Sequence, residues 1–272
     1  MFLLSLCLVA LVPAAFAKNG LNCTVVDEND KPIAKQEVTL TSASGKSSKK
    51  KTNDQGEVKF GGLDDGAYTL AGEIQGYVAA KSAAYELSGN AEKPCKYIVV
   101  SASFANGKLQ EVMQLIQQKK TADAEALAKQ LIEMMPGEGS THYVLAVAYA
   151  YDGNDGAEAE VKKAAELSPE KFKDKVMPIQ MQALNQQAEA AKQKRDYQGA
   201  IKKYEAMQKL SPNDATVYYN MAVAYASAKD YAGALKNIEL TIILKPDDQE
   251  AAKLKAQFEK AFDEQVNKKL EK

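Results

Sequence analysis

Few residues of this protein are of types that carry out catalysis or bind metals. His142 is the only histidine, which excludes a zinc site built on two or more imidazoles. It falls in an apolar, helix-forming stretch, and this favours a packing role over a role as base or ligand. There is no Gly-rich phosphate loop, no G-x-S-x-G sequence and no carboxylate pair that spacing singles out. The sequence therefore predicts a protein that is not an enzyme and holds no cofactor and no metal.

Three charged segments could bind ions, and each has a simpler explanation. "DEND" at 27–30 gathers three carboxylates, but calcium needs six or more oxygens at set spacing, so a solvated turn is favoured. "DGNDG" begins at Asp152, and its twelfth position is Lys163 rather than the Glu of a calcium loop. "KSSKKK" at 46–51 could contact phosphate, but acids balance the lysines of the segment around it. We expect an exposed loop whose charge prevents edge pairing.

The protein as a whole carries almost no net charge, with 35 Lys and Arg against 36 Asp and Glu. Such a balance gives no field that would attract nucleic acid or an anionic membrane. A length of 272 residues with 46% apolar residues fits one or two globular domains.

The first 17 residues have the composition of a secretory signal. Residues 1–17 are uncharged and apolar, and they end Ala15-Phe16-Ala17, a small-x-small pattern that signal peptidase cleaves after. The segment lacks a Lys or Arg before its apolar run, and a retained anchor is the alternative. We expect cleavage, an exported periplasmic or extracellular protein, and no membrane span after cleavage.

Cys7 lies in this signal, which leaves Cys23 and Cys95 as one pair in an oxidising compartment. A bridge between them would close a loop of roughly 70 residues and stabilise the fold by about 4 kcal/mol on the chain-entropy model. We expect this disulfide, and two buried free thiols are the alternative.

Residues 18–101 have the pattern of a small all-β domain. Short runs rich in Val, Ile, Thr and Tyr are separated by Asp, Asn, Gly and Pro turns: "LNCTVV", "QEVTLT", "GEVKF", "AYTLAGEI" and "KYIVVS". The order of turns and glycines resembles the carboxypeptidase regulatory-like, transthyretin-like family, which implies a small antiparallel β-sandwich. The residues that carry this resemblance are Pro32, Thr52, Gly56, Phe60, Leu63, Gly66, Tyr68, Gly76 and Tyr77.

The C-terminal half repeats itself every 34 residues. The repeated positions are an aromatic, a small residue and a proline: Tyr197, Ala200 and Pro212, then Tyr231, Ala234 and Pro246. A small residue permits two helices to cross closely, the aromatic fills the gap between them, and the proline ends the second helix. This pattern resembles the tetratricopeptide repeat (TPR) and implies a solenoid of helical hairpins.

Pro136 and Pro169 occupy the same unit-closing position, so the sequence predicts four units in 108–248. A linker at 102–107 precedes them. An insertion at 170–179 breaks the period and predicts either an extra short helix or a longer first helix. It is also a place where a partner or a second copy of the protein could dock. Residues 249–272 form an amphipathic capping helix in this interpretation, with Ala252, Leu254, Phe258 and Phe262 inside.

The TPR resemblance implies a concave groove lined by the first helix of each unit. Its lining residues by position are Leu109, Met113, Gln117, Tyr143, Val147, Tyr151, Asn185, Glu189, Lys192, Tyr219, Val223 and Ser227. One variant of the family grips a C-terminal carboxylate with a set of Lys, Arg and Asn at these places, and this sequence does not present that full set. We expect an extended peptide or a partner helix on the tyrosines, although each tyrosine could equally pack between hairpins.

The sequence thus predicts a multidomain β + α protein that acts as an exported, non-catalytic adaptor. The alternative is a surface or polysaccharide-associated module, in which the β-sandwich binds glycan and the helices space or oligomerise it.

Overall fold

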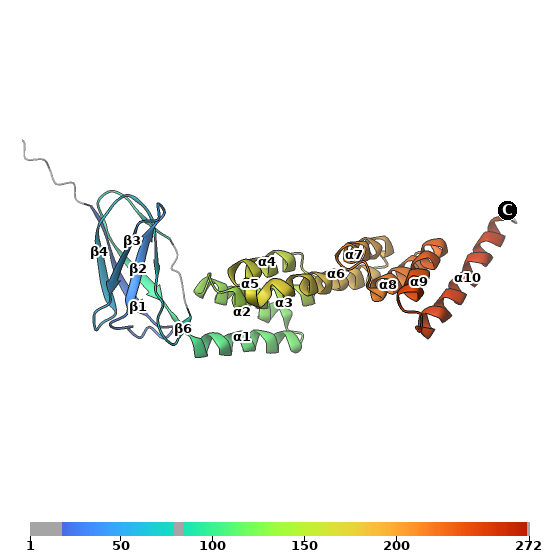
Figure 1. The fold of residues 1–272 in the computed structure, drawn as a ribbon, viewed down its shortest axis with the longest axis horizontal. Helices are drawn as coiled ribbons and strands as arrows, with labels where there is room; N and C mark the ends of the chain where they lie inside the picture. Colours follow the sequence, from blue (N-terminus) through green and yellow to red (C-terminus); the bar gives the residue numbers. More distant parts are fainter. Residues whose placement is uncertain (1–17, 79–83, 271–272) are drawn as a thin grey trace, which may run out of the picture. The chain divides into compact units, whose positions relative to one another are not determined.

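The structure is a computed structural model that describes residues 18–78 and 84–270 (Figure 1). The predicted signal, residues 1–17, lies outside the described residues. The protein divides into two compact units, the first ending at Phe104 and the second beginning at Ala105.

The first unit is built from β-sheets, and in several of its strands buried side chains alternate with more exposed ones. One sheet has the order β4-β1-β8, formed by β1 (Asn19–Val26), β4 (Glu57–Leu63) and β8 (Glu92–Ile98). A second has the order β3-β2-β5-β7, formed by β2 (Glu37–Ser42), β3 (Ser47–Lys51), β5 (Gly66–Ala71) and β7 (Tyr85–Leu87). A short pair joins β6 (Tyr77–Val78) to β9 (Val100–Ser101). The predicted β-sheet unit is confirmed, and its core contains fully buried Phe60, Leu70 and Tyr97.

Two features of the sheets differ from the sequence-based expectation. β1 pairs antiparallel with β4 but parallel with β8, so the unit is not antiparallel throughout. The loop predicted at the basic segment is a strand instead, because Ser47–Lys51 pairs with β2 along its whole length. All five β3 residues are exposed, and Lys49 of this edge strand pairs with Glu37 of β2 at 3.2 Å. Its strand character comes from backbone hydrogen bonds to β2. Because no side chain of β3 is buried, its sequence has no alternation of apolar and polar residues from which a strand could be predicted.

The predicted cysteine pair is bonded. Cys23 and Cys95 lie opposite each other in the parallel pairing of β1 and β8, with Cα atoms 4.4 Å apart, and form a disulfide. Both side chains are buried in the core of the first unit. The bridge therefore links strands that are 72 residues apart in the sequence.

The acidic segment at 27–30 is a structured turn. Asp27 Oδ1 accepts the amide hydrogens of Asn29 at 2.8 Å and Lys31 at 2.9 Å. The Glu28 carboxylate accepts the Ser101 N–H at 2.9 Å and the Ser101 hydroxyl at 2.5 Å. Burial acts to raise the pKa of Glu28, but the hydrogen bonds from Ser101 outweigh it and hold that pKa below the usual value. These acidic side chains therefore have partners within the fold.

The first helix begins earlier than predicted, because α1 (Ala102–Gln117) already starts at Ala102, within the predicted linker at 102–107. The boundary between the two units, after Phe104, falls inside that segment. The Ser101 hydroxyl accepts the Phe104 N–H at 3.3 Å, and the Ala102 N–H donates to Gly76 O at 3.0 Å. These contacts satisfy amide groups of the first helical turn. They offset the low helix propensity of Asn106 and Gly107, which is typical of a linker.

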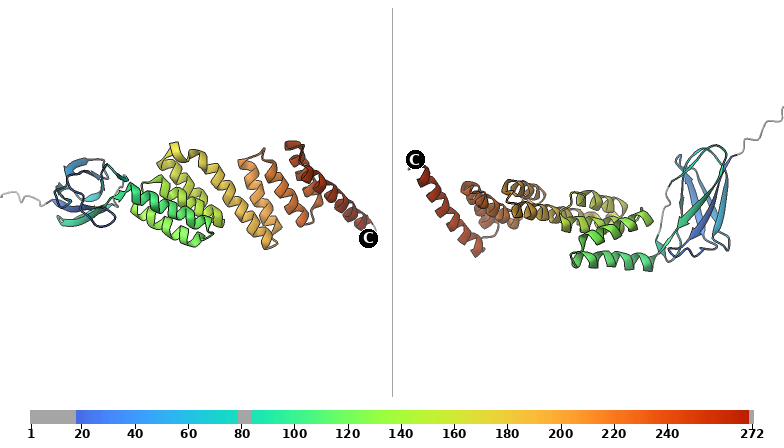
Figure 2. Two further views of the ribbon diagram at one scale, coloured as in Figure 1. Left: turned by 90° about the horizontal axis from the view of Figure 1, so that it is seen from below. Right: turned by 180° about the vertical axis from the view of Figure 1, so that it is seen from behind.

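The second unit is a series of helical hairpins (Figure 2). The hairpins pair α1 with α2 (Thr121–Met134), α3 (Gly139–Asp152) with α4 (Ala157–Leu167), α6 (Val176–Gln193) with α7 (Tyr197–Leu210), and α8 (Ala215–Ser227) with α9 (Tyr231–Leu244). Each hairpin turn contains a residue with positive φ, at Lys119, Gly153, Arg195 and Lys229. A single left-handed residue ends the first helix and reverses the direction of the backbone.

The 34-residue period of the sequence also appears in the burial and hydrogen bonds of the structure. Ala200 and Ala234 are both 0% exposed, as expected for close helix crossings. Asp196 accepts the Gly199 N–H at 2.9 Å, and 34 residues later Asp230 accepts the Gly233 N–H at the same distance. The second helix of each of these hairpins is therefore capped in the same way.

The insertion forms both of the structures that were predicted as alternatives. α5 (Pro169–Phe172) and a 3₁₀ turn at Lys173–Lys175 follow α4, and α6 then extends over 18 residues. The last helix is α10 (Gln249–Leu270), which buries Ala251 and Phe258. Ala252, expected inside, is exposed, because the buried face of α10 lies one residue earlier at this point.

We predict that Cys23→Ala/Cys95→Ala lowers the free energy of unfolding of the first unit by about 4 kcal/mol, because the unfolded polypeptide regains the freedom of a 72-residue loop. Denaturant titration followed by circular dichroism at strand and helix wavelengths measures the effect on each unit. The helical transition serves as the internal control. A loss below about 1 kcal/mol would contradict the loop-closure account.

Candidate functional site

A surface cavity of about 560 Å³ lies between α1 and α3. Its lining residues are Asn106, Leu109, Gln110, Met113, Gln114, Gln117, Tyr143 and Val144. Leu109, Met113, Gln117 and Tyr143 belong to the groove predicted from the sequence, and the structure brings these four together. We call this cavity the α1–α3 groove.

The lining of the α1–α3 groove includes no charged residue, although 26% of the residues in the sequence are charged. Leu109, Met113 and Tyr143 are half-buried and provide an apolar floor. Asn106, Gln110 and Gln114 are exposed and follow one another at four-residue steps along α1. Residues at that spacing share one face of a helix, so their amides form a polar row beside the apolar floor.

Tyr143 is held in place by the insertion. Its ring stacks on Phe172 of α5, with centroids 4.9 Å apart and an angle of 22° between the planes. Gly139 permits this approach, because a Cβ there would lie 3.2 Å from Phe172 Cε2 and 2.9 Å from Ala164 O. Sequence reasoning missed Phe172 and the amide row, although the four-residue spacing of the amides was visible.

Two predicted groove residues of α3 have different surroundings. Val147 is 4% exposed, so it packs between helices and does not reach the groove surface. Tyr151 is 52% exposed near the end of α3 and lies outside the lining of the α1–α3 groove.

The predicted groove residues on α6 also lie outside this cavity. Asn185 is half-buried, and the Glu189 carboxylate accepts hydrogen bonds from Lys192 Nζ and the Tyr204 hydroxyl, both at 2.8 Å. Burial acts to raise the pKa of Glu189, but these two hydrogen bonds outweigh it and lower the pKa. Glu189 therefore joins α6 to α7 as a charged group.

Tyr219 and Val223, the predicted groove residues on α8, are half-buried at the C-terminal end of the array. The Tyr219 hydroxyl donates to Glu250 Oε1 of α10 at 2.9 Å. Burial and this hydrogen bond raise the pKa of Tyr219. Tyr219 thus contacts the capping helix, which is the packing role that the sequence left open for each tyrosine.

His142 contacts a carboxylate in the neighbouring helix. Its Nδ1 lies 2.7 Å from Glu160 Oε2, and the histidine is 9% exposed. The pair connects α3 to α4 inside one hairpin, in line with the packing role expected for this histidine.

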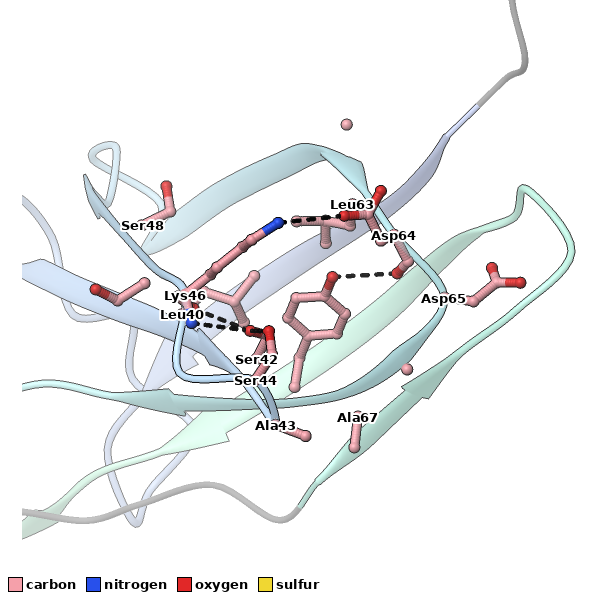
Figure 3. Close-up of a pocket in the computed structure, with 14 residues that line it drawn as sticks. Leu40, Ser42, Ala43, Ser44, Lys46, Ser48, Leu63, Asp64, Asp65 and Ala67 are labelled. Carbon is pink, nitrogen blue, oxygen red and sulfur yellow. Dashed lines mark hydrogen bonds and ion pairs between the residues drawn. The ribbon is translucent and has the colours of Figure 1, made fainter.

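The first unit has a separate pocket of about 320 Å³ at the turns that join β2 to β3 and β4 to β5 (Figure 3). Ser42, Ser44 and Ser48 bring hydroxyl groups to it, and Asp64 and Asp65 bring carboxylates. The ammonium group of Lys46 reaches across to Asp64, 3.9 Å away (Figure 3). Leu40 and Tyr68 are among its apolar lining, so the pocket combines polar and apolar surface.

Neither a metal cluster nor a membrane-spanning helix is present within residues 18–78 and 84–270. In these ranges no three His, Cys, Asp or Glu side chains are grouped so that they could hold a metal ion. No helix of the same ranges is long and apolar enough to cross a membrane.

Family models match both parts of the sequence. Residues 20–97 match the carboxypeptidase regulatory-like domain, and residues 191–258 match the tetratricopeptide repeat. Both matches confirm the resemblances seen in the sequence. No curated protein matches this one.

Solved structures with similar helical arrays are distant. MamA from Desulfovibrio magneticus RS-1 is 17% identical, and the alignment covers 58% of this protein and 85% of MamA with a TM-score of 0.39. For pilF of Pseudomonas aeruginosa the values are 19%, 60%, 70% and 0.36. For the C-terminal TPR-containing domain of a Plasmodium falciparum FK506-binding protein they are 14%, 60%, 91% and 0.36. Because these TM-scores lie below 0.5, the similarities say nothing about a partner for this protein.

We predict that Tyr219→Phe lowers the free energy of unfolding by about 1 kcal/mol, because it removes the hydrogen bond to Glu250 and leaves the ring in place. Tyr151→Phe is the matched control on an exposed tyrosine and should change stability by less than about 0.5 kcal/mol. Denaturant titration and hydrogen exchange of α10 measure both. Equal effects of the two substitutions would show that the Tyr219 hydroxyl does not hold the capping helix.

Proposed function

Because the protein joins a carboxypeptidase regulatory-like domain to tetratricopeptide repeats, we propose that it is an exported, non-catalytic adaptor that binds an extended, uncharged peptide segment in the α1–α3 groove. Tetratricopeptide repeats imply a protein-interaction scaffold, and both domain types are typically non-catalytic. To what the two domain types imply, the proposal adds the cellular location, the binding site and the kind of partner.

The observation that carries the proposal is the composition of the groove. Leu109, Met113 and Tyr143 form an apolar floor on which an apolar partner residue can lose its water shell. A charged partner residue would be desolvated there without an opposite charge, which disfavours it. The Tyr143–Phe172 stack holds one wall in place before binding, so less conformational freedom is lost when a partner arrives.

The amide row favours an extended peptide over a helix. Four residues of an α-helix advance about 6 Å along its axis. Two residues of an extended peptide advance about 6.6 Å. Asn106, Gln110 and Gln114 can therefore face every second residue of an extended peptide. Their donors and acceptors suit backbone C=O and N–H groups, which a helical partner would already have paired.

The disulfide supports an exported location. Cys23–Cys95 is a structural bridge in the core of the first unit, and such bridges persist in oxidising compartments. The apolar, uncharged N-terminal sequence with its Ala-Phe-Ala end adds to this argument.

The pocket of the first unit favours a second candidate function, in which the β-sandwich binds glycan. Ser44, Ser48 and Asp64 offer hydroxyl and carboxylate groups that can exchange hydrogen bonds with sugar hydroxyls. The helices would then space or oligomerise the glycan-binding units.

We predict that Leu109→Ala/Met113→Ala weakens binding of the natural partner at least tenfold, because two anchors of the apolar floor are truncated. Crosslinking and mass spectrometry in the native host identify the partner, and titration with the purified proteins measures its affinity. Ile243→Ala is the control, because Ile243 is 71% exposed on α9 and lies outside the groove. Circular dichroism checks that each variant folds.

Unchanged affinity of the Leu109/Met113 variant would contradict the groove. Binding of the full-length protein to a glycan array, lost in Asp64→Asn, would favour the second candidate function instead.

A further inference from the structure

A second cavity in the helical unit, of about 340 Å³, lies between α4, α6 and α7. It shares no residue with the α1–α3 groove. Its lining residues are Asn154, Asp155, Glu158, Gln180, Ala183, Leu184, Gln187, Lys203, Ala206, Lys209 and Leu210. We call it the α4–α7 cavity.

Opposite charges line the two sides of the α4–α7 cavity. Asp155 and Glu158 come from the start of α4 and the turn before it, whereas Lys203 and Lys209 come from α7. Neither lysine has an ion pair with another residue among those that the structure describes, whereas Glu158 already pairs with Lys162 at 2.5 Å. The lining also includes Leu184, Ala206 and Leu210, which are apolar.

The carboxylate side is fixed by Gln187 of α6. Gln187 Nε2 donates to Asp155 Oδ1 at 2.7 Å and to Gly153 O at 3.1 Å. Gln187 Oε1 is buried and accepts no hydrogen bond from any residue that the structure describes. A buried acceptor without a donor is unfavourable, so an N–H or O–H group brought into this region would stabilise it. Water could supply such a group, and so could a ligand.

The length of the charged sides indicates the size of the ligand. Lys203 and Lys209 are six residues apart on one helix, which corresponds to about 9 Å along its axis. About three residues of an extended peptide span the same distance. A segment of that length carries enough residues to present an acidic, an apolar and a basic side chain.

We propose that the α4–α7 cavity binds an exposed segment of a partner protein in which an acidic and a basic residue flank an apolar one. The acidic residue pairs with Lys203 or Lys209, and the basic residue pairs with Asp155 or Glu158. The apolar residue lies on Leu184, Ala206 and Leu210. This site is independent of the α1–α3 groove and selects charged segments, whereas the groove selects uncharged ones.

The test is selection from a phage-displayed library of random heptapeptides on the full-length protein. Lys203→Glu/Lys209→Glu reverses the charge of one side of the cavity. Lys202→Glu/Lys236→Glu is the matched control, with the same change in net charge at two lysines that do not line the cavity. Leu109→Ala/Met113→Ala reports separately on the groove. The protein has no Trp, so the emission of Trp-labelled peptides measures each affinity directly.

The proposal expects a set of enriched peptides with an acid and a base around an apolar residue. Their affinity should fall at least tenfold for Lys203→Glu/Lys209→Glu and recover when the peptide acid is changed to Lys. The Lys202/Lys236 and Leu109/Met113 variants should bind them as the natural protein does. The proposal is overturned if no peptide is enriched or if the enriched peptides lack paired charges. It is also overturned if Lys203→Glu/Lys209→Glu leaves their affinity unchanged.

Discussion

The close crossing of paired helices at small residues is the constraint on which the helical unit depends. Ala200 and Ala234 stand at equivalent places one 34-residue period apart, and both are fully buried. A larger residue at either place would push the two helices of the hairpin apart. Regular crossings allow one hairpin to stack on the next, and this stacking gives the elongated surfaces on which partners can bind.

Both cavities of the helical unit lie where the repeat is least regular. The α1–α3 groove involves the first hairpin, whose sequence follows the repeat most loosely, and Phe172 of the insertion packs beside it. The α4–α7 cavity is lined by α6, the helix that the insertion lengthens. Regular hairpins bury their facing side chains against their neighbours, as Tyr219 does against α10. Interruptions of the period therefore leave the space that a ligand needs.

Patterns local in sequence predicted most of the fold. The 34-residue repeat of Tyr197 and Ala200 and the prolines at the helix ends indicated the hairpins. The single pair of cysteines left after the signal indicated the bridge. What could not be predicted depends on partners distant in sequence. The parallel pairing of β1 with β8 joins segments about 70 positions apart, and the start of α1 depends on Ser101, which bonds to Glu28, and on Gly76 O, which accepts the Ala102 N–H.

The residues of the candidate site were also predicted only in part. Repeat position predicted Leu109, Met113, Gln117 and Tyr143 for one groove, and these four residues line one cavity in the structure. It failed for Val147, because position along a helix does not say how closely the next hairpin covers a residue.

The most direct test of the central claim compares two alanines of α9. Ala234 is 0% exposed at the crossing, whereas Ala232, two residues earlier, is exposed. The free energy of unfolding of Ala234→Leu and Ala232→Leu, measured by denaturant titration, separates helix crossing from helix propensity. Our account predicts a loss of about 1–3 kcal/mol for Ala234→Leu and a change within about 0.5 kcal/mol for Ala232→Leu. Equal tolerance of leucine at both positions would contradict it.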